Sequence, residues 1–397
     1  MAKKKITDSS DPKLQSLLSN QIQNALGYLG GQLSESRTKS LEYYLGDKLG
    51  TEIDGRSQVV STDVSDTIES LLPNLLRVFT ASDKVVHCEP ITAEDVPMAQ
   101  QATTYLNHVF YKENDGFQLL YNFFKDALIE KNGFLKIYWD DSETVEHETY
   151  ENLSPTEKEA LEDSKDEIEF IEEEVFEDEE AKEQFEATLA QYEAQGMDVS
   201  QIQVPNFDLY NCKIKRIKKT GRVKIESIPP EEFLIDRSAK TIEDANFVAH
   251  KVLMTRSDLV AMGYPQDEVD ELPKSDLDIY DNEQIVRLRD VDNYPINNST
   301  DSSTEKILIF ECYVKYDGDE DGIAELRKIV AAGDNGSHIL SNMPCDTIPF
   351  VTVTPIPMPH RFYGRSISEL VEDVQLMKST VMRQLLDNMY LTNNNRV

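Results

Sequence analysis

The sequence lacks any long hydrophobic run. No stretch of 18 or more consecutive apolar residues occurs, and the basic start "MAKKKITDSSDPK" is followed by no apolar segment. A membrane-spanning helix needs about 20 apolar residues, and a secretory leader needs an apolar core. We therefore expect neither membrane insertion nor secretion.

Cysteine is scarce as well. The four cysteines, Cys88, Cys212, Cys312 and Cys345, lie far apart, and no C-x-x-C pair occurs. Zinc sites and disulfide frameworks both need closely or regularly spaced cysteines. We therefore expect reduced, buried thiols in a cytosol-like compartment.

Short catalytic motifs are also missing. The sequence contains no G-x-S-x-G, no Walker-type loop ending in Gly-Lys-Ser/Thr, no G-x-G-x-x-G and no H-E-x-x-H. The six histidines have no partner at metal-ligand spacing. Acidic pairs are common, but in a chain with 74 Asp and Glu their closeness in sequence carries little information. The sequence therefore predicts no enzyme, no catalytic residue and no cofactor.

Positive charge is the fourth shortage. The 397 residues include 40 Lys and Arg against 74 Asp and Glu, which gives a net charge of −34. A protein that coats nucleic acid is normally basic, so this class is disfavoured. The length and the 39% hydrophobic content fit two or three domains with real cores.

Residues 141–200 hold most of the excess acid, with 23 Asp and Glu, three Lys and a net charge of −20. Apolar residues recur there at roughly helical intervals: Ile168, Ile171, Val175, Phe185 and Leu189. This pattern predicts a mobile, solvated helical insertion that is dispensable for folding. DNA mimicry or metal binding by the same acids is the alternative.

The first third of the sequence predicts a helical layer. Residues 12–45 show apolar recurrence at helical spacing with Gly30-Gly31 inside, which predicts two helices. Residues 64–76 form a further apolar stripe, in which Pro73 should start a new segment or kink the old one.

A helix pair should follow over 98–114 and 116–133, with Gly133 as the C′ glycine of the second helix. The next residues, "FLKIYWD", alternate like a strand. The helical layer therefore leads into a sheet.

From residue 207 onward the pattern is mostly that of strands. One hairpin is predicted around Thr220-Gly221, a second around 317–322, and a last strand in "TIPFVTVTPIPMP". Between the hairpins, Thr255 and Asp258 predict a capping box for a short helix. The fold class is predicted as α+β, with strand-rich material set between helical arms. The expected regions are 1–140, helical and running into the first strand; 141–205, the acidic insertion; 206–355, β-rich; and 356–397, the start of a long helix.

Two charged stretches suggest ligands. In "DGDEDG", Asp317, Asp319 and Asp321 match the first half of an EF-hand loop, but Lys328 stands where a bidentate Glu is needed and strands flank the loop. These three residues are weak metal candidates. The basic run over 213–224 could grip phosphate. We expect it instead to face acidic surface, from the insertion or from an adjacent subunit.

The stretch from 358 to 397 predicts a long amphipathic helix. Ser366 and Glu369 form a capping box at its start. One apolar stripe follows, made of Ile367, Leu370, Val371, Val374, Met377, Val381 and Leu385. The opposite face carries Glu369, Glu372, Thr380, Arg383 and Asp387, with Leu376 as an apolar exception. Such a stripe needs a neighbour, for which another copy of the chain is the best candidate.

Four stretches carry a resemblance to a known family. They are "GRSQVVSTDVSDTIESLLPNLLRVFTAS", "DALIEKNGFLKIYWD", "DGDEDGIAEL" and "HRFYGRSISELVEDVQLMKSTVMRQLLDNMYLTNNN". In this order, over nearly the whole chain, they resemble the portal, or head-to-tail connector, proteins of short-tailed double-stranded-DNA bacteriophages.

The resemblance implies a ring of about a dozen subunits at one capsid vertex, through which double-stranded DNA passes without sequence specificity. The implied partners are the terminase large subunit and the capsid, scaffolding and tail or adaptor proteins. The implied location is the virion, with assembly in the host cytoplasm and no membrane. The family has no active site of its own, and an acidic surface would let the duplex slide.

The resemblance also makes the helix from about 366 the first stem helix, with residues 1–355 mainly wing. A portal would continue into a clip, a second stem helix and a crown, so the chain is expected to lack its C-terminal part. On this interpretation the apolar stripe packs between subunits. Glu369, Glu372, Arg383 and Asp387 are then predicted to face the channel.

Two other classes remain open. One is a capsid-associated scaffold or adaptor without a DNA channel, which particle symmetry would reveal. The other is a metal-dependent nuclease that uses the acidic clusters, which divalent-dependent cleavage of plasmid DNA would reveal.

Overall fold

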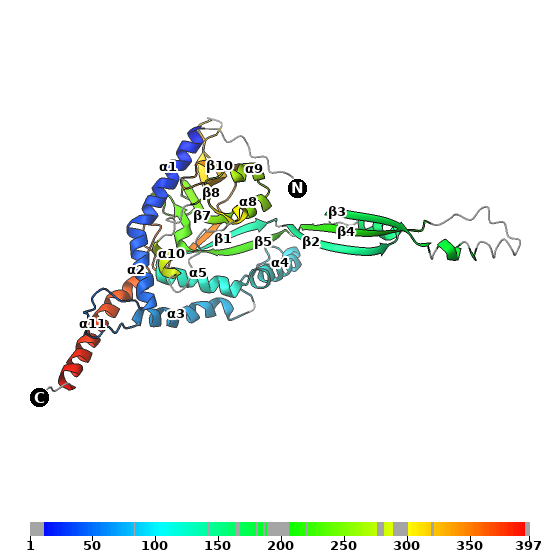
Figure 1. Ribbon diagram of the computed structural model, residues 1–397. Coiled ribbons are helices and arrows are strands. Elements are labelled where there is room, and N and C mark those ends of the chain that lie inside the picture. Colours follow the sequence, from blue (N-terminus) through cyan, green and yellow to red (C-terminus); the bar gives the residue numbers. More distant parts are fainter. Residues whose placement is uncertain are drawn as a thin grey trace. The chain divides into compact units, whose positions relative to one another are not determined.

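The chain folds into mixed helices and strands, as the sequence predicted (Figure 1). The computed structural model describes residues 12–82, 84–141, 143–162, 167–179, 182–185, 187–188, 206–219, 221–275, 282–288, 301–318 and 321–393. The chain divides into two compact units. Unit 1 comprises Met1–Tyr138 with Ile225–Val397, and unit 2 is Trp139–Lys224. The region boundaries predicted from the sequence remain predictions.

The front of unit 1 contains the two helices expected there. Helix α1 (Pro12–Tyr28) passes through a π-helical turn (Leu29–Leu33) into α2 (Ser34–Leu45). The break falls at Gly31, whose φ of −91° and ψ of −134° are not helical. The glycine pair therefore separates two helices, as predicted.

The next helix corrects one of the two expectations for Pro73. Helix α3 (Asp63–Thr80) is one element with Pro73 inside it, so the proline does not start a new segment, and a kink stays a prediction. Its buried face, Val64, Ile68, Leu72 and Leu76, runs on both sides of the proline. Packing along this face outweighs the lost backbone hydrogen bond.

The predicted helix pair is confirmed as α4 (Val96–His108), which continues as a π-helical turn (Val109–Glu113), and α5 (Gly116–Glu130). Gly133 is not a C′ residue of α5, however, because it begins β1 (Gly133–Asp140). Lys131 makes the turn instead, with a φ of 84°. Glycine is needed at 133 for a different reason: a Cβ there would lie 2.1 Å from the carbonyl oxygen of Phe123 in α5.

Two sheets form the β part of unit 1. The first has the order β11-β1-β5, and the second has the order β10-β9-β8-β7-β6. Their remaining strands are β5 (Arg222–Ile228), β6 (Phe233–Ile235), β7 (Phe247–Thr255), β8 (Lys306–Tyr316), β9 (Glu325–Ala332), β10 (His338–Pro344) and β11 (Phe350–Val353). The predicted hairpin at 317–322 is confirmed, because β8 pairs antiparallel with β9.

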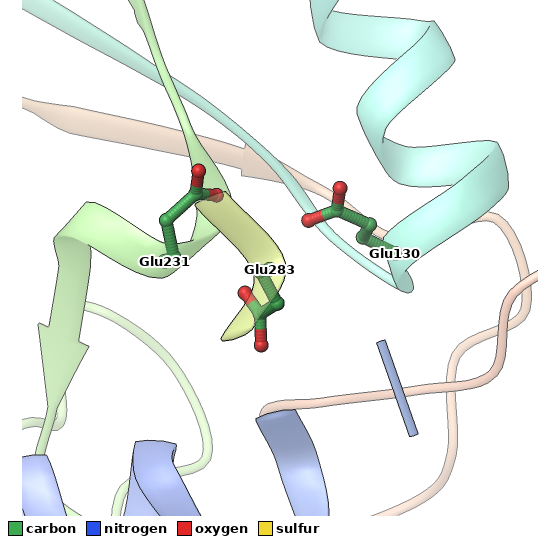
Figure 2. Close-up of side chains that lie close together, drawn as sticks. All are labelled: Glu130, Glu231 and Glu283. Carbon is green, nitrogen blue, oxygen red and sulfur yellow. The ribbon is translucent and has the colours of Figure 1, made fainter. Parts of the chain in front are cut away.

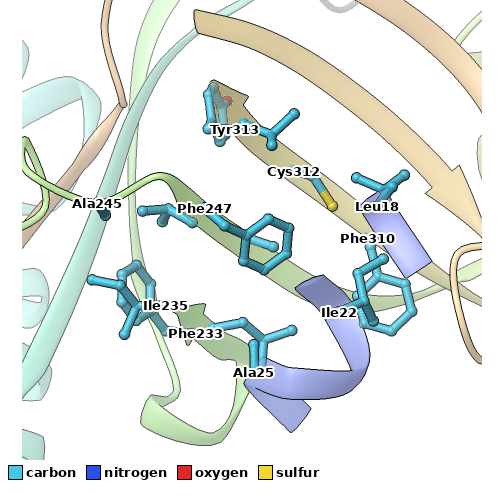
Figure 3. Close-up of a cluster of buried hydrophobic side chains, with 14 of the residues drawn as sticks. Leu18, Ile22, Ala25, Phe233, Ile235, Ala245, Phe247, Phe310, Cys312 and Tyr313 are labelled. Carbon is cyan, nitrogen blue, oxygen red and sulfur yellow. The ribbon is translucent and has the colours of Figure 1, made fainter. Parts of the chain in front are cut away.

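Alternating side chains of the five-stranded sheet enter two different cores. Leu308 and Phe310 join the core beneath α1, and Figure 3 shows Leu18 and Ile22 of α1 beside Phe310. Ile307 and Ile309 point to the opposite face, as the period of two along a strand requires. There they meet residues of the short helices α8 (Arg256–Ala261) and α9 (Gln266–Asp270).

The predicted capping box at Thr255 is confirmed, since its side chain accepts from the backbone N–H of Asp258 and the reverse bond is also present. The four cysteines are free. Cys212 and Cys312 are buried, and burial raises the pKa of the Cys312 thiol. Cys88 and Cys345 are only partly buried.

A separate core lies among helices. This core joins α2, α3 and α5 with the long helix α11 (Ser368–Asn393). Val371 and Leu376 of α11, and Ile367 just before the helix, pack against the core. Helix α10 (Asn282–Arg287) lies next to α2. Among the described residues, no helix combines the length and apolar character that crossing a membrane requires.

Unit 2 corrects two expectations at once. Its sheet has the order β2-β4-β3, with β2 (Glu143–Leu153), β3 (Glu167–Glu177) and β4 (Asp208–Lys219), and α6 (Pro155–Glu162) is a helix between β2 and β3. Most described residues of the acidic segment therefore lie in strands and not in the predicted helices, because a basic strand neutralises their glutamates. The hairpin predicted at Thr220-Gly221 is also wrong, since β4 pairs with β2 and β3 while β5 joins β1. Leu189 lies outside the described residues.

Candidate functional site

Hydrogen bonds hold the start of α11 against the rest of unit 1. The hydroxyl of Ser366 accepts a hydrogen bond from the backbone N–H of Glu369 at 3.2 Å, which is one of the two bonds of the predicted capping box. The backbone N–H of Ile367 donates to the carbonyl of Leu128 in α5 at 3.0 Å. These bonds set the direction in which the helix leaves the core.

The face of α11 that packs on the body is polar. Gln375 is fully buried; its Oε1 accepts from the backbone N–H of Val64 at 2.8 Å and its Nε2 donates to the carbonyl of Tyr43 at 3.0 Å. Ser379, also fully buried, accepts from the backbone N–H of Ser61 at 3.0 Å. These side chains satisfy backbone groups at the ends of α2 and α3, so they hold three helices in one arrangement.

Arg383 and Asp387 extend this polar contact to the segment after α2. Arg383 is 6% exposed and donates to the carbonyl of Val59 at 2.8 Å and to Thr51 Oγ1 at 2.9 Å. The carboxylate of Asp387 accepts from the backbone N–H of Ser57 at 2.9 Å. Both residues therefore fix segment 51–59 against the helix.

Glu369 and Glu372 bind helix α2 and its surroundings. Glu369 pairs with Lys131 at 2.9 Å and accepts from Ser36 at 3.1 Å. Burial works to raise the pKa of Glu369, but these partners outweigh it and the pKa is lowered. Glu372 pairs with Lys39 at 3.1 Å. The four residues predicted to face a channel thus all have partners within their own chain.

The apolar stripe shows the opposite behaviour. Five of its predicted members are exposed: Leu370 at 46%, Val374 at 50%, Met377 at 62%, Val381 at 63% and Leu385 at 60%. Ile367 and Val371 are partly buried against the helical core. Met389, Tyr390 and Leu391 add further exposed apolar surface toward the end of the helix. We call the five exposed residues the α11 stripe.

The basic run lies on β4, at the centre of the unit 2 sheet, as far as Lys219, and its last members, Arg222 and Lys224, lie on β5. Lys215 pairs with Glu169 of β3 at 2.9 Å, and Arg216 pairs with Glu148 of β2 at 2.9 Å. Lys213 pairs with Glu172 of β3. The prediction that this run faces the acidic insertion is therefore confirmed for these three residues, and the prediction that it does not bind DNA stays a prediction.

The EF-hand-like loop uses its acids to build the turn between β8 and β9. The carboxylate of Asp317 accepts from the backbone N–H groups of Asp321 at 3.2 Å and Gly322 at 2.9 Å. Asp321 accepts from the backbone N–H of Ile323 at 2.7 Å. Asp319 lies outside the described residues. The described acids thus have a structural role that needs no ion.

Sequence reasoning missed the most buried polar residues of the site. Gln375 and Ser379 lie one helical turn apart on the same side of the helix, and this pair of uncharged polar residues was the only hint in the sequence that this side is buried. The sequence could not show what they bind, because their partners at 43, 61 and 64 are more than 300 residues away.

A comparison with protein families gives one match along almost the entire chain. The family described as "Phage SU10 portal protein" matches residues 14–397, which include both units and α11.

Proposed function

The chain belongs to the phage SU10 portal protein family, and from this premise we propose that it is a subunit of a head-to-tail connector. By family it is a structural protein of a bacteriophage, not an enzyme. In the proposed assembly, a ring of about a dozen subunits stands at one capsid vertex and conducts double-stranded DNA during packaging and ejection. Helix α11 would be its first stem helix.

The α11 stripe carries this proposal. Its five aliphatic side chains are 46–63% exposed along one face. The helix cannot roll to bury them, because Gln375 and Arg383 hold its other face on the body. Contiguous apolar surface of this kind is typical of an interaction site. In a ring, each copy can cover the stripe of its neighbour through a head-to-tail contact that closes on itself.

The polar face has a different part in the proposal. Glu369, Glu372, Arg383 and Asp387 support the helix from within the chain, so we propose that they position α11 for assembly. Whether any of them also faces a channel stays a prediction, since neighbouring copies decide it. The net charge of −34 favours a conduit over a clamp, because an acidic surface does not retain phosphates.

The proposed partners follow from the connector role. They are further copies of the chain, capsid and scaffolding proteins, the terminase large subunit, and tail or adaptor proteins. The proposed location is the capsid vertex of the virion, after assembly in the host cytoplasm.

A single substitution on the stripe tests the proposal. Val374→Asp places a charge at the contact between copies and should abolish rings, while the melting temperature of the monomer changes little because Val374 is 50% exposed. Thr380→Asp, an exposed change on the same helix away from the stripe, is the control and should keep the rings.

Assembly is read by mass photometry and by negative-stain imaging of the full chain. Central-channel rings for the unaltered chain and Thr380→Asp, with monomers for Val374→Asp, are the expected result. A monomeric or linear unaltered chain would contradict the connector proposal and favour a scaffold or adaptor. Unchanged rings of Val374→Asp would show that the stripe is not the contact.

A further inference from the structure

We propose that Glu130, Glu231 and Glu283 form a binding site for one divalent cation inside unit 1. Glu130 is the last residue of α5, Glu231 lies in the 3-10 turn Pro230–Glu232, and Glu283 lies in α10. One carboxylate oxygen from each lies within 4.8 Å of the others. Figure 2 shows the three carboxylates around a common space, each from a different element.

The cluster is buried and carries an excess of negative groups. Arg287 pairs with Glu130 at 2.7 Å, with Glu231 at 3.0 Å and with Asp126 at 3.5 Å. Arg37, fully buried, lies 3.8 Å from Glu283. Among the described residues, these two guanidinium groups and Lys125, which acts on Asp126, are the cations that lie near the four carboxyl groups.

Negative charge in a buried cluster costs free energy unless it is compensated. The three glutamates are at most 1% exposed. An uncompensated charge in such surroundings costs several kcal/mol, so it is normally neutralised by a proton, a partner or a metal ion. A divalent cation held by Glu130, Glu231 and Glu283 would be such a partner.

Two oxygen atoms point to an ion in particular. Glu130 Oε2 and Glu231 Oε1 are buried, and neither has a hydrogen-bond partner among the residues that the structure describes. The other oxygen of each residue is the one that binds Arg287. Arg287 therefore holds the two carboxylates from one side and leaves one acceptor of each for a further ligand.

A cavity gives access to the cluster. Its volume is about 440 Å³, and Asp126, Glu130 and Arg287 are among its lining residues. Carboxylate oxygens are the ligands that Ca²⁺, Mg²⁺ and Mn²⁺ prefer, and the remaining coordination positions of such ions are commonly filled by water. The cavity has room for those waters.

The test uses the full chain after treatment with a chelator. CaCl₂, MgCl₂ and MnCl₂ are each titrated by calorimetry, and thermal unfolding is followed with and without each ion. We expect saturable binding of one ion per chain for at least one of the three, and a melting temperature that rises with its concentration.

Variants then assign the site. Glu231→Gln should abolish binding and the ion-dependent rise in melting temperature. Its melting temperature in chelator serves as its own baseline, because the substitution also weakens the buried contact with Arg287. Asp317→Asn alters the EF-hand-like loop and should leave binding intact. If Glu231→Gln fails to fold, Glu283→Gln is measured in the same way.

Three results would overturn the inference. The first is no saturable binding of any of the three ions. The second is binding that survives both glutamine variants. The third is loss of binding in Asp317→Asn. None of them bears on the connector proposal, because ring formation is scored separately.

Discussion

Arg383 of α11 and Glu52 form a buried ion pair in which both side chains are 8% exposed. The same guanidinium also donates to the carbonyl of Val59 and to the hydroxyl of Thr51. Burial alone would raise the pKa of Glu52, but backbone N–H groups and Arg383 lower it. One arginine therefore ties the long helix to a segment more than 300 residues away in sequence.

Arg383→Met should lower the free energy of unfolding by about 3–5 kcal/mol, because it leaves the Glu52 carboxylate buried without its partner. Urea unfolding measures the change. Lys378→Met is the matched control on the same helix, since Lys378 pairs with Asp63 but is 52% exposed. An exposed pair contributes about 0–1 kcal/mol. Equal losses in the two variants would show that Arg383 does not anchor the helix.

Glu311 should make the stability of unit 1 sensitive to acid. Burial opposes the ionised form, but Lys136 and Lys328 outweigh it and lower the pKa of Glu311 to about 2. The unfolded chain then binds this proton more readily than the folded chain. The stabilisation is therefore present above about pH 4.5 and is lost as the pH falls toward 2.

The shift corresponds to at most roughly 3 kcal/mol. Chemical unfolding between pH 7 and pH 3 should show that the stability difference between the unaltered chain and Glu311→Gln shrinks with falling pH. A difference that stays constant over this range would contradict the assignment.

Unit 2 should be removable as a whole but not in part. Replacing residues 141–219 by Asn-Gly should leave a cooperative thermal transition, because the cores of unit 1 use no residue of that segment. The replacement needs only a short connection, since a Cβ at position 221 would lie 2.5 Å from the Trp139 ring. Differential scanning calorimetry would show loss of the transition if unit 1 depended on unit 2.

Deleting only residues 141–200 is a sharper comparison. It removes β2 and β3 and leaves both edges of β4 without partners. Unpaired strand edges promote association between chains. We therefore expect this shorter deletion to aggregate in light scattering while the 141–219 replacement stays monodisperse at the same low concentration.

The basic strand β4 should not retain duplex DNA at physiological salt. Lys213, Lys215 and Arg216 are engaged by glutamates of β2 and β3. Fluorescence anisotropy with a labelled duplex should give equally weak binding for the unaltered chain and for Lys213→Ala with Lys215→Ala. Tight binding that this double variant removes would mean that the strand grips phosphate after all.

Local sequence signals predicted structural elements well where the residues that determine an element lie close together in the sequence. The break at Gly31, the capping box at Thr255, the hydrogen bond from the backbone of Glu369 to Ser366, and the hairpin between β8 and β9 all depend on neighbours within a few residues. The failures arose where distant residues decide. Pro73 stays inside α3 because packing holds the helix, and Gly133 is needed because the backbone of α5 passes close to it.

The acidic segment shows the limit of periodicity. "EIEFIEEEVFE" reads as a charged helix when taken alone, because its apolar residues recur at roughly helical intervals. In the folded chain Lys213 and Lys215 of β4 stand across from Glu172 and Glu169 of this stretch. With these basic residues opposite, the glutamate-rich stretch forms a strand of a sheet. The prediction of an oppositely charged partner was therefore right, although the predicted helix was wrong.

Composition and local pattern were sufficient for the α+β class, the absence of familiar catalytic motifs and the existence of an amphipathic helix at 366–393, because each depends on residues close together in the chain. Tertiary structure alone decided which side of that helix is covered. Buried Gln375, Ser379 and Arg383 find backbone and carboxylate partners between α2 and the first turn of α3, so the polar side packs and the α11 stripe stays exposed. Hydrophobicity cannot foresee this outcome, since polar groups can be buried wherever distant partners complete their hydrogen bonds.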